Sequence, residues 1–519
     1  MSPVAITFAV LALAVIAFIS NRVPLGVVAL GVTVSLWATG VISLDQAVAG
    51  FGDPTVIFIA SLFVVSHSLE ATGVTAWAGQ QVVARGLRKR APLIVVISLL
   101  VAVLSALISI NGAVAALIPV VVVVAVRAGL PPSQLLMPLA FAAHGGSMLA
   151  LTGTPVNIIM SEAAADATGR PFGFFEFALT GGPLVLGTIV IVACFGGRLL
   201  PTREITALPP DLDAYAQVLR EQYDLPQSTE LMSVRNGVVE VVVAPRSTLI
   251  GLHLFRGQVT PSGDLVVMGL QRAGEDLTGP EIRLQAGDTM LLRGAWDHLE
   301  QHTAGPDLLV VDSPKRLRRA VPLGRGAKRA LIVLGGMVGL LAFSPAPPAM
   351  IGVSAALVLV ATGVLTPSQA YRAVSWTTVL LIAGMMPLST AFRTTGAADL
   401  IADLVMRLGG HASAHFALAV LCVMTVVLGQ LISNVATVLI MLPIAVSLAA
   451  DLQVSVLPFL MALAVAGAAA FLTPVATPAN TMVMDPGGYR FGDYWKLGLP
   501  LLALFLVVAV FWVPLWWPF

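Results

Sequence analysis

The feature that most restricts the fold is a long apolar stretch with polar side chains at its centre. Residues 416–450 are almost entirely apolar, yet one membrane-spanning helix needs only about 20 residues. Gln430, Ser433, Asn434 and Thr437 lie in the middle of the stretch. Amides and hydroxyls in hydrocarbon are costly unless they find hydrogen-bond partners. The pattern therefore predicts a re-entrant helical hairpin whose tip, Ser433 and Asn434, faces a cavity lined by protein.

A second copy of this stretch lies in the first half of the chain. Asn111 precedes Asn434 by 323 residues, and one ungapped offset pairs polar and turn residues over more than 100 residues. The matched residues include Gln46 with Gln369, Thr55 with Thr378, Thr72-Gly73 with Thr395-Gly396, and the Thr-Pro-x-Asn turns that begin at Thr154 and Thr477. Such matches are rare by chance. We therefore interpret the chain as two homologous membrane halves, the plan of many secondary transporters.

A basic loop predicts that the two halves are inserted in opposite directions. Residues 85–90 contain four Lys or Arg residues, whereas the matching residues 408–415 contain none. Loops rich in Lys and Arg stay in the cytoplasm, so the same position faces opposite sides in the two halves. The repeats are then inverted, and their hairpin tips enter from opposite sides and meet near the membrane midplane.

Composition agrees with a protein that crosses the membrane many times. Of 519 residues, 57% are hydrophobic and 11% are charged, whereas a soluble protein has roughly 25% charged residues. The net charge of +1 gives no case for nucleic-acid binding. Cys194 and Cys422 fall in apolar segments, which predicts packing thiols. The N-terminus lacks a basic segment, which predicts a retained first span.

The expected fold class is an all-α polytopic membrane protein of two inverted repeats, each with about five spans and one re-entrant hairpin. Residues 74–90, and their counterpart up to about residue 408, are expected to form interfacial arms. Both termini are expected outside. The expected segments are 4–20, 23–42, 54–69, hairpin 92–126, broken helix 134–165 and 176–198, then 330–344, 349–365, 376–392, hairpin 416–450, broken helix 456–484 and 497–517.

The sequence between the halves predicts a small α+β domain. Residues 203–313 contain no apolar span, and β-like runs occur at 238–243, 265–270 and 289–292. The expected domains are membrane repeat 1 at 1–202, the inserted domain at 203–313 and membrane repeat 2 at 314–519. The flank that follows is basic, with seven Lys or Arg residues between 315 and 329. This predicts a cytoplasmic inserted domain and a protein of the cell membrane.

The hairpin tips and the broken helices form the predicted transport site. Their carbonyl and hydroxyl oxygens can ligate a cation, and their amide donors and helix N-terminal N–H groups can hold an anion. The alternative is that these polar side chains only join helices by hydrogen bonds, but their repetition in both halves favours transport. The predicted substrate-binding residues are Asn111, Gly112, Asn434, Val435, Thr437, Thr154, Pro155, Asn157, Thr477, Pro478 and Asn480.

Other energy sources and activities find less support in the sequence. No phosphate-binding GxxxxGK[ST] motif indicates an ATP-driven pump, and no acidic residue lies mid-span to drive a proton cycle. Backbone carbonyls with Asn and Ser suit Na⁺. His144 is interpreted as a packing or hydrogen-bonding residue, with a proton relay as the alternative. No paired carboxylates or His/Cys cluster indicates an enzyme.

The motifs resemble the divalent anion:sodium symporter family. Residues 433–445 (SNVATVLIMLPIA) and 111–120 (NGAVAALIPV) are similar to its hairpin signatures, and 153–163 (GTPVNIIMSEA) to its broken-helix turn. Residues 476–501 are similar to the C-terminus of its sulfate-permease-like branch. Residues 225–300, with STLIGLHL and LQAGDTMLLRG, resemble a TrkA-C regulatory domain.

The resemblance implies a homodimer that moves sodium ions and a divalent anion past a fixed scaffold by an elevator mechanism. It implies a possible small-molecule ligand for the regulatory domain. Asn111, Asn434 and the second-tip hydroxyl would face the anion. The implied sodium ligands are Ser109, Asn111 and Gly153 in one site and Ser433, Asn434 and Ala476 in the other.

Both tips depart from the Ser-Asn-Thr pattern of the family. The first reads Ile110-Asn111-Gly112, and in the second Val435 follows Asn434, with Thr437 two positions further on. Hydroxyls that would touch carboxylates are therefore missing, which favours a small tetrahedral oxyanion such as sulfate. Dicarboxylate, phosphate and arsenite-like substrates stay open. A channel gated by the inserted domain is a further alternative, although no TVGYG-type filter is present.

Overall fold

The structure is a computed structural model, and its described residues form two compact units. The membrane unit comprises residues 1–68, 79–207 and 329–519, and the sheet unit comprises 69–78 and 208–328. Most of both interfacial arms, of the basic loop and of the basic flank lies outside the described residues. The structure describes all residues except 1, 21, 76, 79–80, 82–88, 204–216, 218, 224, 227–230, 232–235, 261, 278, 280, 312–325, 399 and 401–412.

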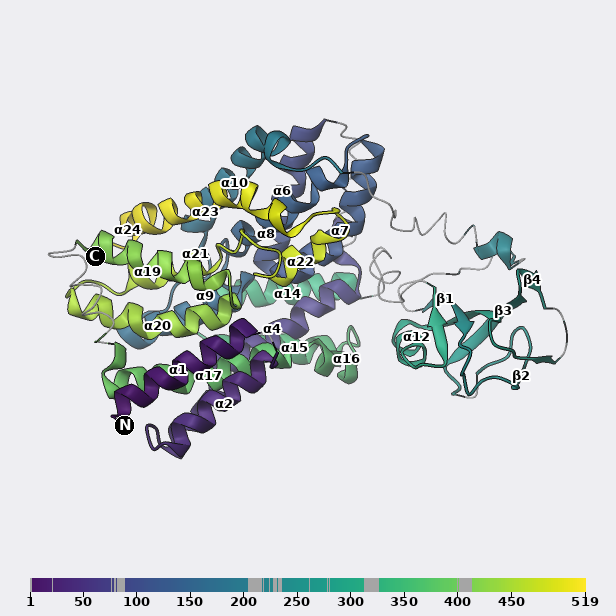
Figure 1. Cartoon of the computed structure of the whole chain (residues 1–519), viewed down its shortest axis with the longest axis horizontal. Helices are drawn as coiled ribbons and strands as arrows, with labels where there is room; N and C mark the ends of the chain where they lie inside the picture. The colour runs from purple at the N-terminus through teal and green to yellow at the C-terminus, as the bar shows by residue number, and fades with distance from the viewer. Residues whose placement is uncertain are drawn as a thin grey trace. The chain divides into compact units, whose positions relative to one another are not determined.

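The membrane unit is built from helices (Figure 1). Those of the first half are α1 Pro3–Ser20, α2 Leu25–Ala38, α3 Leu44–Ala49, α4 Pro54–Ala71, α6 Arg90–Leu107, α7 Ile110–Arg127, α8 Leu136–Ser147, α9 Pro155–Thr168 and α10 Ala178–Leu199. Those of the second half are α14 Ala327–Phe343, α15 Pro348–Ala361, α16 Pro367–Ala373, α17 Trp376–Thr395, α19 Ala414–Gly429, α20 Asn434–Asp451, α21 Leu457–Gly467, α22 Pro478–Met484, α23 Tyr494–Val507 and α24 Val513–Trp516.

Length and apolar composition make many of these helices able to cross a membrane. Within the described residues, seven helical segments qualify, or eight if the pair α16 and α17, bent by 54°, is one span. Four shorter apolar helices, α2, α15, α19 and α21, cover further predicted segments. The helices of both predicted hairpins and both predicted broken helices are present.

The predicted repeat extends to backbone geometry. Gly40 and Gly363, which are 323 residues apart, follow equivalent helices with φ of 72° and 69°. Gly73 and Gly396 have the same offset and φ of 71° and 74°. Glycine adopts positive φ without steric cost. Both α3 and α16 begin with a reciprocal Ser/Thr–Gln capping box at matching positions. The two halves therefore share local structure as well as sequence.

One helix contact occurs twice with the halves exchanged. A Cβ on Gly384 of α17 would lie 2.9 Å from the carbonyl carbon of Ala29 in α2. A Cβ on Gly352 of α15 would lie 2.1 Å from Oγ of Ser61 in α4. Gly352 matches Ala29 and Gly384 matches Ser61 at the offset of 323. Small residues let helix backbones approach closely, so each half packs a small-residue face against the other in the same manner.

The hairpins differ by one residue from the alignment made on sequence. The N-cap residues are Ser109 for α7 and Ser433 for α20, an offset of 324 rather than 323. Asn111 is therefore the second residue of its helix, whereas Asn434 is the first. One position turns a side chain by about 100° around a helix axis. The treatment of the two asparagines as equivalent needs this correction.

The sheet unit contains the inserted α+β fold. Its main sheet is antiparallel with the strand order β4-β3-β6-β1-β7, and a separate pair joins β2 and β5. The three predicted β-like runs lie within β1, β3 and β6. The elements are β1 Asn236–Val243, β2 His253–Leu254, β3 Leu265–Arg272, β4 Glu275–Asp276, β5 Ile282–Arg283, β6 Thr289–Ala295, α12 Trp296–Thr303 and β7 Leu308–Val310.

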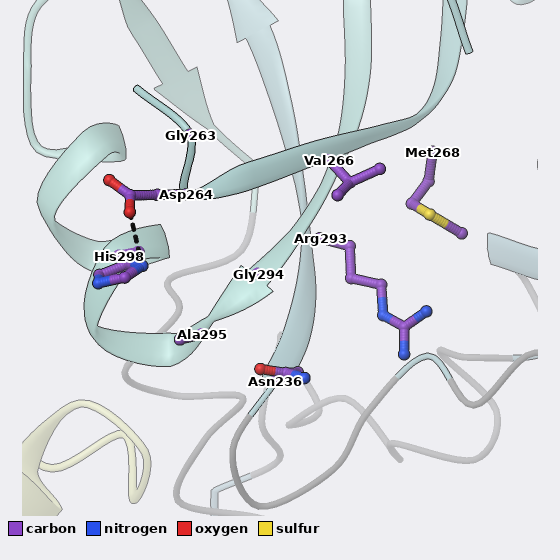
Figure 2. Close-up of a pocket in the computed structure, with 9 residues that line it drawn as sticks. All are labelled: Asn236, Gly263, Asp264, Val266, Met268, Arg293, Gly294, Ala295 and His298. Carbon is purple, nitrogen blue, oxygen red and sulfur yellow. Dashed lines mark ion pairs between the residues drawn. The ribbon is translucent and has the colours of Figure 1, made fainter. Parts of the chain in front are cut away.

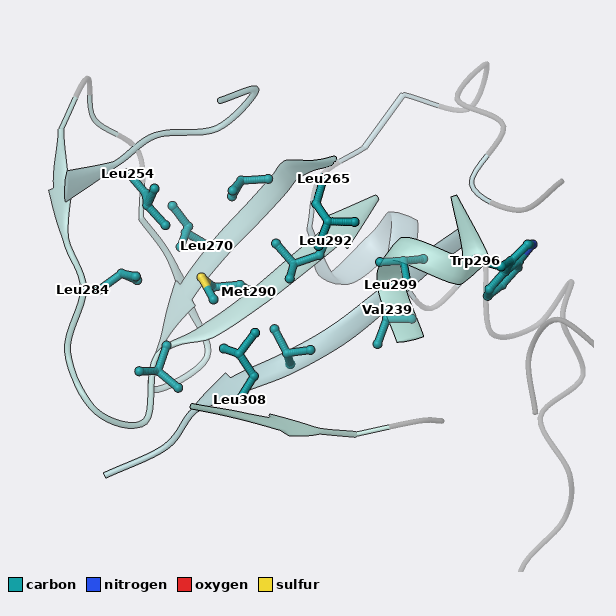
Figure 3. Packing of buried hydrophobic residues seen from close by; sticks show 13 residues of the cluster. Val239, Leu254, Leu265, Leu270, Leu284, Met290, Leu292, Trp296, Leu299 and Leu308 are labelled. Carbon is teal, nitrogen blue, oxygen red and sulfur yellow. The ribbon is translucent and has the colours of Figure 1, made fainter. Parts of the chain in front are cut away.

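Two apolar clusters cover the two faces of this sheet. Leu292, Trp296 and Leu299 belong to the larger cluster, which joins one face to α12 (Figure 3). Leu291 and Tyr223 belong to the smaller cluster on the other face. Alternation of Leu291 and Leu292 between the faces follows from the two-residue period of a strand. The inserted segment thus has a core of its own.

Acid is expected to weaken the sheet unit through Asp288. This buried carboxylate accepts hydrogen bonds from Arg272 at 2.7 and 2.8 Å and from the Gln285 N–H at 2.7 Å. Burial alone would raise the pKa of Asp288, but these bonds and the Arg272 charge outweigh it and lower the pKa. The stabilisation is therefore present above the unfolded pKa of about 3.9 and is lost as pH falls through the lower folded pKa.

Hydrogen exchange of the β1 and β6 peptides, corrected for the intrinsic pH dependence of exchange, measures this loss. Protection should fall in the native protein as the pH drops below the unfolded carboxyl pKa of about 3.9. Arg272→Gln should lower the free energy of protection at neutral pH by about 2 kcal/mol, because it leaves a buried carboxylate with fewer donors. In this variant the protection should also depend less on pH in the acid range. An unchanged acid response in Arg272→Gln would contradict this role.

Candidate functional site

Serine hydroxyls cap the second helix of each hairpin. Ser109 Oγ accepts a hydrogen bond from the Gly112 N–H at 3.1 Å at the start of α7. Ser433 Oγ accepts one from the Ala436 N–H at 3.3 Å at the start of α20. A helix N-terminus carries partial positive charge and unpaired N–H groups. Each tip therefore presents a capped, electropositive helix start.

The second tip holds polar oxygens that find no partner. Asn434 Oδ1 and Thr437 Oγ1 are buried, and neither has a hydrogen-bond partner among the described residues. The side chain of Thr437 is fully buried, whereas Asn111 is exposed at the first tip. Buried polar atoms without partners are rare and are expected where a ligand or ion binds. The two tips thus differ in burial although their sequences repeat.

Asparagines hold the breaks in both broken helices. Asn157 Nδ2 donates to the carbonyls of Ser147 and Ala150, both at 2.9 Å. At the offset of 323, Asn480 Nδ2 donates to the carbonyls of Ala470 and Thr473, at 2.8 and 3.1 Å. Carbonyls freed by a helix break must find donors inside the protein. The sequence predicts these asparagines as substrate ligands. In the structure their side-chain N–H groups donate hydrogen bonds to backbone carbonyls instead.

What these asparagines can still offer is an acceptor. Asn157 Oδ1 is buried and has no hydrogen-bond partner among the described residues. Asn480 Oδ1 is also buried, and the side chain that interacts with Asn480 is the imidazole of His144. An amide oxygen suits a cation or an N–H or O–H donor, whereas an oxyanion needs donors. These two side chains therefore fit a cation more readily than the predicted anion.

The second helices of the two broken helices, α9 and α22, begin in the same way. Thr154 and Thr477 are the N-cap residues of α9 and α22, and a proline occupies the next position in both. Thr477 Oγ1 accepts from the Asn480 N–H at 3.4 Å. In the first half, a Cβ on Gly153 would lie 2.1 Å from the Ser147 carbonyl oxygen. The chain turns back on the end of α8 so tightly there that only glycine fits.

Each broken helix packs against the hairpin of the other half. Helix α22 contacts α7, and α9 contacts α20 and α21 (Figure 1). Thr477 Oγ1 also lies 3.3 Å from Nε2 of the fully buried His144. The structure thus places the predicted tip and turn residues of both halves on elements that pack together within one unit. Of the remaining predicted residues, Gly112 and Ala476 are buried, Val435 and Pro155 are half-buried, and Pro478 is exposed.

The sequence analysis did not predict several hydrogen bonds that connect the two broken helices to neighbouring segments. Thr152 Oγ1 donates to the Ala106 carbonyl at 2.9 Å in the first half. Gln430 donates to the Ala469 carbonyl and accepts from the Leu472 N–H, both at 3.0 Å, in the second. Tyr494 OH donates to the Asn480 carbonyl at 2.7 Å. Of these residues, the sequence analysis named only Gln430, as one of the polar residues in the apolar stretch 416–450.

Comparison with known proteins decides the family. The family model of citrate transporters (CitMHS) matches residues 15–419 and 406–519. The chain belongs to this family. It is accordingly a multi-pass membrane transporter, which confirms the resemblance of its membrane halves to anion transporters at the level of the family.

The chain is similar to further known proteins. The chain is 29% identical to the uncharacterized transporter YfbS of Escherichia coli, covering 98% of both chains. It is 26% identical to sodium/sulfate cotransporter 1 of Chlamydomonas reinhardtii, over 53% of this chain and 32% of that relative. The solved YdaH transporter of Alcanivorax borkumensis matches 92% of this chain and 88% of its own, at 15% identity and a TM-score of 0.48.

Proposed function

We propose that this family member is a secondary transporter that carries a divalent oxyanion, sulfate first, together with sodium across the cell membrane. The observation that carries the proposal is the second tip, where Asn434 Oδ1 and Thr437 Oγ1 are buried without partners beside a capped helix start. Similarity to a relative named as a sodium/sulfate cotransporter supports the choice of ions.

The anion would bind between the starts of α7 and α20. Backbone N–H groups and partial positive charge at a helix N-terminus favour anions. The side-chain amides of Asn111 and Asn434 would add donors. The remaining proposed contacts are Gly112, Val435, Thr437, Thr154, Pro155, Thr477 and Pro478, on the same tips and turns.

Sodium would be held by oxygens of the tips and breaks. Ser109, Asn111 and Gly153 are the proposed ligands of one ion, through side chains or carbonyls. Ser433, Asn434 and Ala476 are those of the other. The buried oxygen of Asn157, which has no partner among the described residues, lies on the helix that follows the first break. It adds to the supply of acceptors that Na⁺ requires.

Movement would follow the elevator plan, in a homodimer. Both hairpins are re-entrant in this proposal and move with the broken helices, while the close-packed pairs α2–α17 and α4–α15 belong to the fixed scaffold. The domain at 203–313 would be cytoplasmic, of the TrkA-C type, and would regulate transport on binding a small molecule.

Radiolabelled sulfate uptake into proteoliposomes tests the proposal. An inward sodium gradient should raise the initial rate several-fold over a matched potassium gradient. The family description favours one second candidate, a carboxylate such as citrate. Excess citrate, succinate or phosphate in the same assay identifies the preferred anion. Sulfate uptake that ignores the sodium gradient, or no sulfate uptake beside active citrate uptake, would contradict the first assignment.

A further inference from the structure

The sheet unit contains a cavity that the transport site does not use. Its volume is about 470 Å³, within the range of small-molecule sites. Residues from the starts of β1 and β3, the end of β6 and the first turn of α12 line it (Figure 2). All of these elements belong to one unit with its own core. The cavity is therefore a property of the inserted fold.

Arg293 is a charged lining residue of this cavity that makes no ion pair with the described residues. On β6 it lies between Val238 and Val266 of the neighbouring strands. It shares a sheet face with Leu291, two residues earlier, whose apolar cluster packs against Met268. Figure 2 shows its guanidinium on the same side as Val266 and Met268. Among the described residues it makes no ion pair, although it is half-buried.

The carboxylate of the cavity is already paired elsewhere. Asp264 lies 3.3 Å from Nδ1 of His298 and 2.9 Å from Nε2 of His302, which are one turn apart on α12. Figure 2 shows the Asp264–His298 pair on the opposite side of β6 from the Arg293 side chain. Among the described lining residues, the cavity therefore combines one unpaired cation, an apolar wall and a carboxylate turned toward histidines.

We propose that this cavity binds a small molecule with a carboxylate, sulfate or phosphate group, anchored on Arg293, and with its apolar part against Val266 and Met268. A guanidinium presents two parallel N–H donors that match such groups in a bidentate manner. This binding depends only on residues of the sheet unit. Only its effect on transport rests on the proposed function.

Hydrogen exchange of the full-length purified protein tests the site. Sodium sulfate, sodium phosphate, citrate and adenosine monophosphate are added separately at equal ionic strength, against sodium chloride. At least one should slow exchange in the β3 and β6 peptides several-fold. Arg293→Gln should weaken binding and so raise the half-saturating anion concentration by about tenfold or more. The matched control Arg283→Gln, an exposed arginine on β5, should leave it unchanged.

Further variants in the same experiment distinguish this site from the transport site. Asn434→Ala should keep the protection of β3 and β6, because that residue lies in the membrane unit. Exchange of β1 without ligand reports whether Arg293→Gln is folded, and Arg293→Lys, which keeps the charge but not the fork, should bind with intermediate strength. Protection by none of the four anions, or protection unchanged in folded Arg293→Gln, would overturn the site without affecting the transport proposal.

Discussion

Asn434→Ala is expected to lower sodium-dependent sulfate uptake by about 10- to 100-fold. This residue opens α20, and its buried Oδ1 has no protein partner among the described residues. A lost hydrogen bond to a charged group costs about 1.5–3 kcal/mol, and each 1.4 kcal/mol is a factor of ten. The protein should still fold, because no hydrogen bond from the Asn434 side chain to the described residues is lost.

Initial uptake rates at several sulfate concentrations measure this effect. Thr362→Ala is the control, since its exposed hydroxyl only caps the end of α15 at 2.7 Å from the Val358 carbonyl. Asn111→Ala should also reduce uptake, and the two single variants should not be additive if both side chains face one anion. Full uptake by both single variants would remove the basis for a site between the tips.

Gly153→Ala is expected to destabilise the membrane unit by about 2 kcal/mol and to abolish most uptake. The added methyl would lie 2.1 Å from the Ser147 carbonyl oxygen, a distance that no Cβ contact tolerates. Overpacking of this kind costs about 1–3 kcal/mol. Because Asn157 Nδ2 also binds that carbonyl, relief of the clash would shift the break and the start of α9 with it.

Thermal unfolding in detergent and sulfate uptake together measure this prediction. Gly182→Ala in α10 is the matched control, because a Cβ there meets no atom within 4 Å. This variant should have the same unfolding temperature and the same sulfate uptake rate as the native protein. Equal behaviour of the two variants would show that the tight turn at Gly153 has no special role.

Much of the fold could be predicted because turn residues encode local geometry. Gly73 and Gly396 match in the sequence repeat, and in the structure they have nearly the same positive φ, 71° and 74°. The apolar run with a polar centre at Asn434 predicted a helix break, since hydrocarbon penalises unpaired amides. The β-like runs of the sheet unit were recognisable from their β-branched residues and intervening turns.

The contacts that assemble the site could not be predicted in this way. Asn157 was expected to face the substrate, but its donors bind carbonyls that only a break in the helix exposes. His144 meets Thr477 across 333 residues, and no local pattern reports a contact of that kind. The alignment of the two tips depends on which residue caps the helix. In both halves the N-cap is a serine, Ser109 or Ser433, and not the asparagine on which the sequence alignment was based.

Anomalous diffraction from crystals soaked in sodium selenate, a heavier analogue of sulfate, tests the central claim most directly. The claim is that tips and breaks of two opposed halves create one oxyanion site. It predicts a single strong selenium peak in the membrane unit, next to the starts of α7 and α20 and displaced by excess sulfate. A selenium peak in the membrane unit remote from both helix starts, or none at saturating selenate in a protein that transports sulfate, would contradict it.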